Sequence, residues 1–455
     1  LTDSVIGYPQ SLAIFSKAVQ NVGIRKYRTI EYYPVNDFTT QGVIQFMING
    51  NGASYIDLSK TLLNIKCKIV RRDGSNIAHA ATVNPNQPSL ALAQPPVQVL
   101  PPAPGDTGKE AGSGNPDSGN SEGTNPGGAT SRKARDTTSR SRVGVVGVVN
   151  NFMNSMFGRV DLSLQNRLLT DSDNSYAYQA YFKTLLHTPN ESKNVSLQMQ
   201  MYYPSKYQSY NSKSWTTSDD EGFSTRSQFF TRSREIDMCG KLACDAFEID
   251  RLIPNGVSLQ LTLYPNTPEF CLMTPDIVPI PDYKVVITKA SLQIWHAEIS
   301  PEIIAAHSEI LVSEPALFPY TKTEIKKFTL SQGVFGAELN NPFESRLPSE
   351  LVIGMVSGEA SHGDFQADPF LFEHNNLNFI QVTCDGEDLN NSPIMTKYSQ
   401  TPEESLYMDA YKTLCGVDGR PGENPISRRD FFHGYTLYRF VVEHEDTTNS
   451  SDVVP

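Results

Sequence analysis

The sequence predicts an all-β fold built from two β-rich blocks, and three observations lead to this prediction. Apolar and polar residues alternate with a period of two over many short stretches, as they do along half-buried strands. The 455 residues include 20 Tyr and 22 Phe against 2 Trp, with 30 Gly and 30 Pro, which is typical of short strands joined by frequent turns. Once an insertion at about residues 74–142 is set aside, two blocks of similar size, roughly residues 30–270 and 283–446, carry this pattern, and two jelly rolls side by side would account for them.

The clearest alternation lies between residues 43 and 69. Ile44, Phe46 and Ile48 share one face, a break rich in Asn and Gly follows at 49–52, and apolar residues alternate again from 63 to 69. Asn-Gly steps tolerate positive φ, so the chain can reverse there. We therefore expect these two strands to pair antiparallel, with a second sheet covering their apolar face.

The remaining elements follow from the same two periodicities. Strands are expected at residues 160–164, 257–263, 285–294, 325–330, 351–356, 378–384 and 435–443. The alternation changes phase around Thr288, which predicts a β-bulge there. Short helices are expected over 178–185, after Ser300-Pro301 and after the capping box at 401–404, whereas 188–235 is expected to be a long loop.

The expected domain organisation is an arm, two rolls and a tail. The arm covers residues 1–30, the first jelly roll 31–275, the second 283–446 and the tail 447–455. A flexible loop of about residues 74–142 is inserted in the first roll. This stretch is rich in Pro, Gly, Ser and Asn and holds no aromatic residue, so it cannot bury enough apolar surface to offset its ordering entropy.

Charge and cysteine usage exclude several classes of protein. The formal net charge of −12 argues against a nucleic-acid binder whose whole surface does the binding. No secretory signal begins the chain, and no run approaches the roughly 20 apolar residues that span a membrane. The six cysteines are widely scattered, so we expect reduced thiols and no disulfide framework.

Some local patterns resemble metal or acid–base sites, but a structural role explains each better. Cys239 and Cys244 have the spacing of half a zinc site and lack the other ligands. His296, Glu298 and His307 are close in sequence, but the first two lie on a strand and the third on a helix. We interpret the cysteines as buried or loop thiols and the other three as polar edge residues.

Other patterns match the letters of a site without its spacing. Residues 361–364 (SHGD) contain the letters of a catalytic triad, yet neighbours in sequence rarely have triad geometry. Asp171, Asp173 and the stretch 385–388 only partly match a calcium loop, and turns or helix caps explain them. We therefore expect no catalytic, cofactor-binding or metal-binding residues.

A basic cluster at the end of the insertion is the candidate for nucleic-acid contact. It consists of Arg132, Lys133, Arg135, Arg140 and Arg142. Charge runs beside flexible segments are usually solvated, and five cations are a modest electrostatic footprint. Contact with a genome is therefore expected to be local at most.

Eight motifs occur in a characteristic order over about 350 residues by our count. They are 55–63 (YIDLSKTLL), 149–157 (VNNFMNSMF), 176–181 (YAYQAY), 252–257 (LIPNGV), 305–307 (AAH), 347–354 (LPSELVIG), 368–372 (DPFLF) and 431–437 (FFHGYTL). In this order the chain resembles the double jelly-roll major capsid proteins, or hexon-like proteins, of Polinton-type elements, adintoviruses and adomaviruses. It departs from that pattern in its long insertion and in Gln165-Asn166-Arg167, which stands where an Asn-Gly turn is common.

The resemblance implies two consecutive eight-stranded jelly rolls with short helices and long loops, and no enzyme activity or cofactor. It also implies a homotrimer with a pseudo-sixfold outline that tiles the icosahedral shell of a non-enveloped double-stranded DNA virus. The implied partners are neighbouring capsomers, penton proteins and minor capsid or cement proteins. The implied location is the virion capsid, assembled inside the host cell in the nucleus.

Two other functions would use a similar fold. A secreted jelly-roll lectin or adhesion protein would want a signal peptide, disulfides, and exposed aromatics beside carboxylates. The first is absent from the sequence and the second has no support there. A carbohydrate-active enzyme would need two carboxylates about 5–10 Å apart across a groove.

Overall fold

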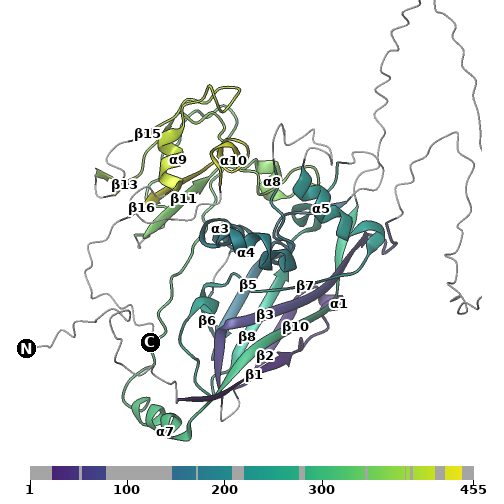
Figure 1. Cartoon of the computed structure of the whole chain (residues 1–455), viewed down its shortest axis with the longest axis vertical. Coiled ribbons are helices and arrows are strands. Elements are labelled where there is room, and N and C mark those ends of the chain that lie inside the picture. Colours follow the sequence, from purple (N-terminus) through teal and green to yellow (C-terminus); the bar gives the residue numbers. More distant parts are fainter. Residues whose placement is uncertain are drawn as a thin grey trace, which may run out of the picture. The chain divides into compact units, whose positions relative to one another are not determined.

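The computed structural model describes residues 23–50, 54–77, 146–170, 173–206, 220–275, 282–343, 347–384, 386–389, 393–415 and 426–442. Within these ranges the chain is mostly β, with curled sheets and short helices (Figure 1). The expected arm before residue 23, most of the insertion, residues 276–281 and the tail lie outside the described residues. None of the described helices is both long enough and apolar enough to cross a membrane.

Two antiparallel sheets, each of four strands among the described residues, form the first block. The first sheet has the order β1 (Ile24–Tyr32), β10 (Tyr283–Ile299), β3 (Ser54–Arg71) and β7 (Ile236–Gly240). The second has the order β2 (Ile44–Ile48), β8 (Leu259–Pro265), β5 (Phe157–Leu164) and β6 (Arg167–Leu168). A short ladder joins β4 (Gly147–Val148) to β9 (Leu272–Met273).

Period-two alternation decides which side chains enter the core between these sheets. Ile44, Phe46 and Ile48 of β2 are fully buried, whereas Met47 between them is 46% exposed. Leu261 on β8 lies opposite Phe46 and is buried with it. Inward residues of both sheets belong to one hydrophobic cluster, so the sheets pack face to face.

The prediction that β2 and β3 pair with each other is wrong. β2 pairs with β8, while β3 pairs with β10, where Leu63 lies opposite Leu292. The two strands therefore belong to different sheets of the block. Alternation shows which face of a strand is buried, but it does not identify the neighbouring strand.

β10 lies in the first block, although the sequence places its residues at the start of the second roll. It pairs with β3 from Tyr283 to Glu298 and with β1 from Leu292 to Ile299. β1 itself includes residues that the sequence assigns to the arm. The bulge predicted near Thr288 is confirmed, because the register shifts between Ile287 and Lys289.

Several helices lie where the sequence predicts a loop. Within 188–235 the structure has α4 (Asn190–Asn194), η2 (Ser196–Gln200), α5 (Glu221–Phe229) and η3 (Thr231–Ser233). The predicted helices α3 (Tyr176–His187) and α7 (Pro301–Ile310) are confirmed.

Residues 401–404 form turns rather than a helix start, and α9 (Met408–Cys415) begins four residues later. The other short helices are α1 (Phe38–Gln41), α2 (Phe152–Ser155), η4 (Asp245–Glu248), α6 (Pro268–Cys271), α8 (Gly358–His362) and α10 (Arg428–Phe432).

The second block, residues 347–442, contains shorter ladders. Where it is described, β11 (Glu350–Gly354) pairs with β16 (Leu437–Val441), β12 (Phe379–Ile380) with β15 (Ile394–Met395), and β13 (Thr383–Cys384) with β14 (Glu387–Asp388). Three of the predicted strands therefore correspond at least in part to observed ones. The strand predicted at 325–330 is wrong, because these residues carry no ladder in the structure. They belong to a connecting segment, residues 300–343, between the blocks.

We expect Phe46→Ala to lower the free energy of unfolding by about 3–5 kcal/mol, because it opens a cavity between the two sheets. Met47→Ala removes a side chain from the other face of the same strand and is the matched control, with an expected change of about 1 kcal/mol or less. Urea unfolding followed by fluorescence measures both. Equal losses for the two variants would contradict this assignment of faces.

Candidate functional site: the joint between the two blocks

Helix α3 lies at the centre of the contact between the first and second blocks. Its residues 176–181 are all buried, a run longer than one helical turn, so every side of the helix is covered there. One side packs on α2 and β5 of the first block. The other side contacts residues 370–372 of the second block.

Aromatic rings make the contact between the blocks. The rings of Tyr181 and Phe370 stack at 4.1 Å between centroids with an interplanar angle of 9°. Tyr178 meets Phe370 edge-on at 5.8 Å, and Phe182 lies 5.2 Å from Phe372. Phe370 and Phe372 are fully buried. Large rings in stacked and edge-to-face arrangements stabilise a contact through buried area and ring geometry together.

Hydrogen bonds anchor α3 to the Asn-rich motif on the first-block side. The Tyr176 hydroxyl donates to Asn154 Oδ1 at 2.7 Å, and Asn154 Nδ2 donates to Gln200 Oε1 at 3.1 Å. Gly240 is required beside this network, because a Cβ there would collide with the side chain of Gln200. The buried side chains of Asn151, Asn154 and Ser155 are hydrogen-bonded, which favours one arrangement of the joint.

A buried arginine holds the chain that meets the second block. The Arg226 guanidinium is completely buried and donates to the carbonyls of Val148 and Tyr203 and to Ser205 Oγ. From the second block, the Tyr435 hydroxyl donates to the Ser205 carbonyl at 2.7 Å. Burial raises the pKa of Tyr435 well above its usual value, so the hydroxyl remains a neutral donor.

An ionic cluster ties the end of α3 to β11 and β16. Arg439 donates to both Glu350 carboxylate oxygens, at 2.9 and 3.3 Å, and His187 Nε2 of α3 lies 3.9 Å from Glu350 Oε2. The imidazole of His187 and the guanidinium of Arg439 lower the pKa of Glu350 to about 2. Arg439 makes the shorter contacts and carries a permanent charge, so we assign it the larger share of this effect.

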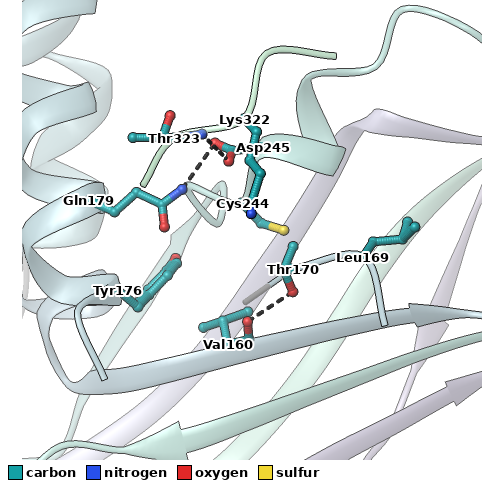
Figure 2. A pocket seen from close by; sticks show the side chains of 9 residues that line it. All are labelled: Val160, Leu169, Thr170, Tyr176, Gln179, Cys244, Asp245, Lys322 and Thr323. Carbon is teal, nitrogen blue, oxygen red and sulfur yellow. Dashed lines mark hydrogen bonds between the residues drawn. The ribbon is translucent and has the colours of Figure 1, made fainter. Parts of the chain in front are cut away.

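A small hollow beside α3 marks where the connecting segment attaches to the first block. Figure 2 shows Asp245 between Gln179 and Thr323, and its carboxylate accepts from Gln179 Nε2 at 3.0 Å and from the Thr323 backbone N–H at 2.7 Å. Lys183 Nζ lies 2.5 Å from the same carboxylate. The hollow encloses about 10 Å³, enough for a single water. The Asp245 carboxylate therefore contacts other groups of the chain itself, one of them the backbone N–H of Thr323.

Residues weighed as histidine or cysteine sites lie apart in the structure. His296 contacts Tyr32 and Ser54, whereas His307 contacts Tyr55. All six cysteines are free thiols. In the described part of the chain, no three His, Cys, Asp or Glu residues gather closely enough to hold a metal ion.

The remaining sequence candidates have local partners where they are described. His362 Nδ1 bonds the Gly358 carbonyl of its own helix, and Asp364 accepts from the Gln366 N–H. Asp173 lies in a turn with positive φ. Asp171, Asp385 and the basic cluster Arg132, Lys133, Arg135, Arg140 and Arg142 lie outside the described residues.

The structure brings together motifs that the sequence shows only separately. Motifs 149–157, 176–181, 368–372 and 431–437 all contribute side chains to the joint. Arg226 and Asp245 were missed, because neither lies in a motif or in a periodic stretch. A charged residue that becomes buried gives no local sequence signal unless its partner is known.

Comparison with known proteins gives distant similarities. No family model matches the chain. An uncharacterised protein of Caenorhabditis elegans is 24% identical over 301 residues, which cover 64% of this chain and 67% of that protein. Solved structures that resemble it are viral: a Sputnik virophage chain, the Faustovirus major capsid protein and the mavirus major capsid protein.

The structural similarities cover part of each protein. For the Sputnik, Faustovirus and mavirus chains in turn, identities are 12%, 12% and 13%, and TM-scores are 0.35, 0.33 and 0.27. The matches cover 66%, 66% and 67% of this chain but 53%, 58% and 54% of those chains. The chain therefore matches little more than half the length of each, and TM-scores below 0.5 do not establish a shared fold.

We expect Phe370→Ala to uncouple the two blocks and to lower the free energy of unfolding by about 3–5 kcal/mol, because the ring fills the space between Tyr178 and Tyr181. Differential scanning calorimetry should then show two transitions where the unmodified chain shows one. Phe229→Ala, at a ring that is 38% exposed, is the control and should keep a single transition. A single transition for Phe370→Ala as well would contradict the role of the joint.

The lowered pKa of Glu350 predicts that the free energy of unfolding decreases as the pH is lowered into the acid range. Its folded-state pKa of about 2 lies below the ordinary 4.5, so the stabilisation is complete above about pH 4.5 and is lost as pH falls towards 2. We expect Glu350→Gln to flatten this part of the profile, measured by urea unfolding from pH 6 down to 2.5. Glu302→Gln on exposed α7 should retain the profile of the unmodified chain. An unchanged slope in Glu350→Gln would refute the assignment.

Proposed function

We propose that this chain is the major capsid protein, or hexon, of a non-enveloped icosahedral double-stranded DNA virus of the Polinton, adintovirus or adomavirus type. In this proposal both blocks are jelly rolls, and three chains form a pseudo-hexameric capsomer. The capsomers tile the virion shell, with penton and minor capsid or cement proteins as neighbours. Assembly takes place inside the host cell, in the nucleus.

The observation that carries the proposal is the buried aromatic joint around α3. A shell subunit must transmit contact forces as one body, and stacked rings with a bonded polar network hold two β-rich blocks in one arrangement. Four of the eight motifs that carry the resemblance meet at this joint. The motif order therefore has a physical reason, because these segments must fit one another.

The outer surface supports self-association. Large apolar side chains are uncovered on the connecting segment and on the second block, including Val312 at 88% and Leu406 at 68% exposure. Exposed apolar surface of this extent marks protein interaction sites in soluble proteins. Burial of such surface between identical chains is the mechanism by which the proposed capsomer forms.

Light scattering and negative-stain microscopy of the purified chain test the proposal. We expect a mass of three chains at micromolar concentration and particles with three lobes and six corners. Apolar surface buried between copies stabilises this trimer, so dilution should reveal monomers that unfold at lower temperature. A well-folded monomer at micromolar concentration would contradict the proposal.

A further inference from the structure

Among the described residues, two groups of exposed apolar side chains lie in the connecting segment and in the second block, and they differ in form. The first is a run within the connecting segment, residues 328–337 (FTLSQGVFGA), which carries no charged residue. Phe328, Leu330 and Val334 are each more than half exposed, and Phe335 is fully exposed. An uncharged apolar segment left in water is an aggregation hazard, so its stable state requires cover.

The second surface is a small face of the second block. Phe379 pairs with Met395, and Lys397 exchanges both backbone hydrogen bonds with Leu406. Leu406 lies in an isolated bridge and Met408 begins α9 (Met408–Cys415). Ile394 and Tyr407 are buried, whereas Met395, Leu406 and Met408 are exposed. Together Phe379, Met395, Leu406 and Met408, which are 46–68% exposed, form one outward apolar face.

The start of the run is fixed to its own first block. The Thr323 N–H bonds Asp245, and Lys327 Nζ lies 4.7 Å above the ring of Tyr178. The chain therefore projects residues 328–337 from a defined point. No segment among the described residues covers the run or the face, and a second copy of the chain is the occupant that supplies both surfaces.

Charges at the edges of the two surfaces are complementary. Lys326 and Lys327 precede the run, and Glu338 follows it. The apolar face has exposed Glu403 and Glu404 near one edge and exposed Lys397 within it. Lys327 is held over Tyr178, so the remaining pairing sets Lys326 near the glutamates of the face and Glu338 near Lys397, which favours one orientation.

We propose that residues 328–337 of one copy lie on the face formed by Phe379, Met395, Leu406 and Met408 of the next copy. This inference rests on the proposed function, because it assigns the seam of the trimer. The contact is heterologous, run to face, and in the proposed trimer three such contacts related by threefold rotation close a ring. Each chain donates one run and accepts another.

The test uses complementary variants of the full chain in sedimentation velocity at micromolar concentration. Phe335→Asp damages the run and keeps the face, while Leu406→Asp damages the face and keeps the run. We expect each variant alone to dissociate at concentrations at least about tenfold higher than the unmodified trimer does, because a charge is buried in the contact. An equimolar mixture should form dimers of one copy each, joined by the intact run and the intact face.

The control is Val195→Asp, at a side chain that is 73% exposed and outside both surfaces, and it should remain trimeric. If the unmodified chain is a trimer and both variants remain trimers, the proposed contact between the run and the face is wrong, whereas the proposed function is not contradicted. An unmodified monomer would instead contradict the proposed function itself. Variants that dissociate without forming mixed dimers would overturn the run-to-face contact.

A cysteine pair gives a second measurement that does not depend on dissociation. The variant with both Phe335→Cys and Leu406→Cys should form disulfide-linked dimers and trimers on a non-reducing gel under mild oxidation. The two single-cysteine variants control for the native thiols and should remain single chains. A cross-link confined to one chain would show that the run folds back on its own face, and would overturn the proposal.

Discussion

The burial of α3 on all sides is the constraint on which the rest of the structure depends. A helix with one apolar stripe can lie on a sheet and leave its other side in water, but residues 176–181 have no exposed member. The sandwich covers one side through α2 and β5, so the other side needs a second layer. The stacked pair Tyr181 and Phe370 supplies it, and the second block is thereby held against the first.

The polar groups at the joint explain why it has a single arrangement. An apolar contact alone tolerates sliding, because its energy depends on area more than on direction. The hydrogen bonds from Tyr176 to Asn154 and from Tyr435 to Ser205 have fixed geometry, and leaving them unmade in a buried site is costly. Arg226 extends the same constraint to the backbone at Val148. The aromatic rings therefore stabilise the contact between the two blocks, and the hydrogen bonds fix how the blocks are positioned against each other.

Sequence periodicity predicted much of the local structure and little of the pairing. The alternation in β2, the bulge at Thr288 and helix α3 could be predicted because each depends on residues adjacent in the chain. The partners of β3 could not, because β10 is more than 200 residues away and many apolar strands could fill that place. The helices of 188–235 are short and are stabilised by tertiary contacts, such as that between Gln200 and Asn154, rather than by amphipathic spacing. Each motif of the joint could be recognised by itself in the sequence, but the contacts between the motifs depend on the fold.

Among the described residues, the polar groups beside α3 and the apolar side chains at the surface differ in how far the chain itself covers them. At the hollow beside α3, Asp245 bonds the chain's own Thr323, and the remaining space fits one water. By contrast, Phe335 and Leu406 are exposed to solvent, and backbone hydrogen bonds from Val334 to Ser331 and between Leu406 and Lys397 lie beside them. Exposure of these two apolar side chains to water is unfavourable in free energy, and burial against another protein chain would remove this cost. The fold therefore leaves these apolar side chains exposed at the surface, where contact with another protein would bury them.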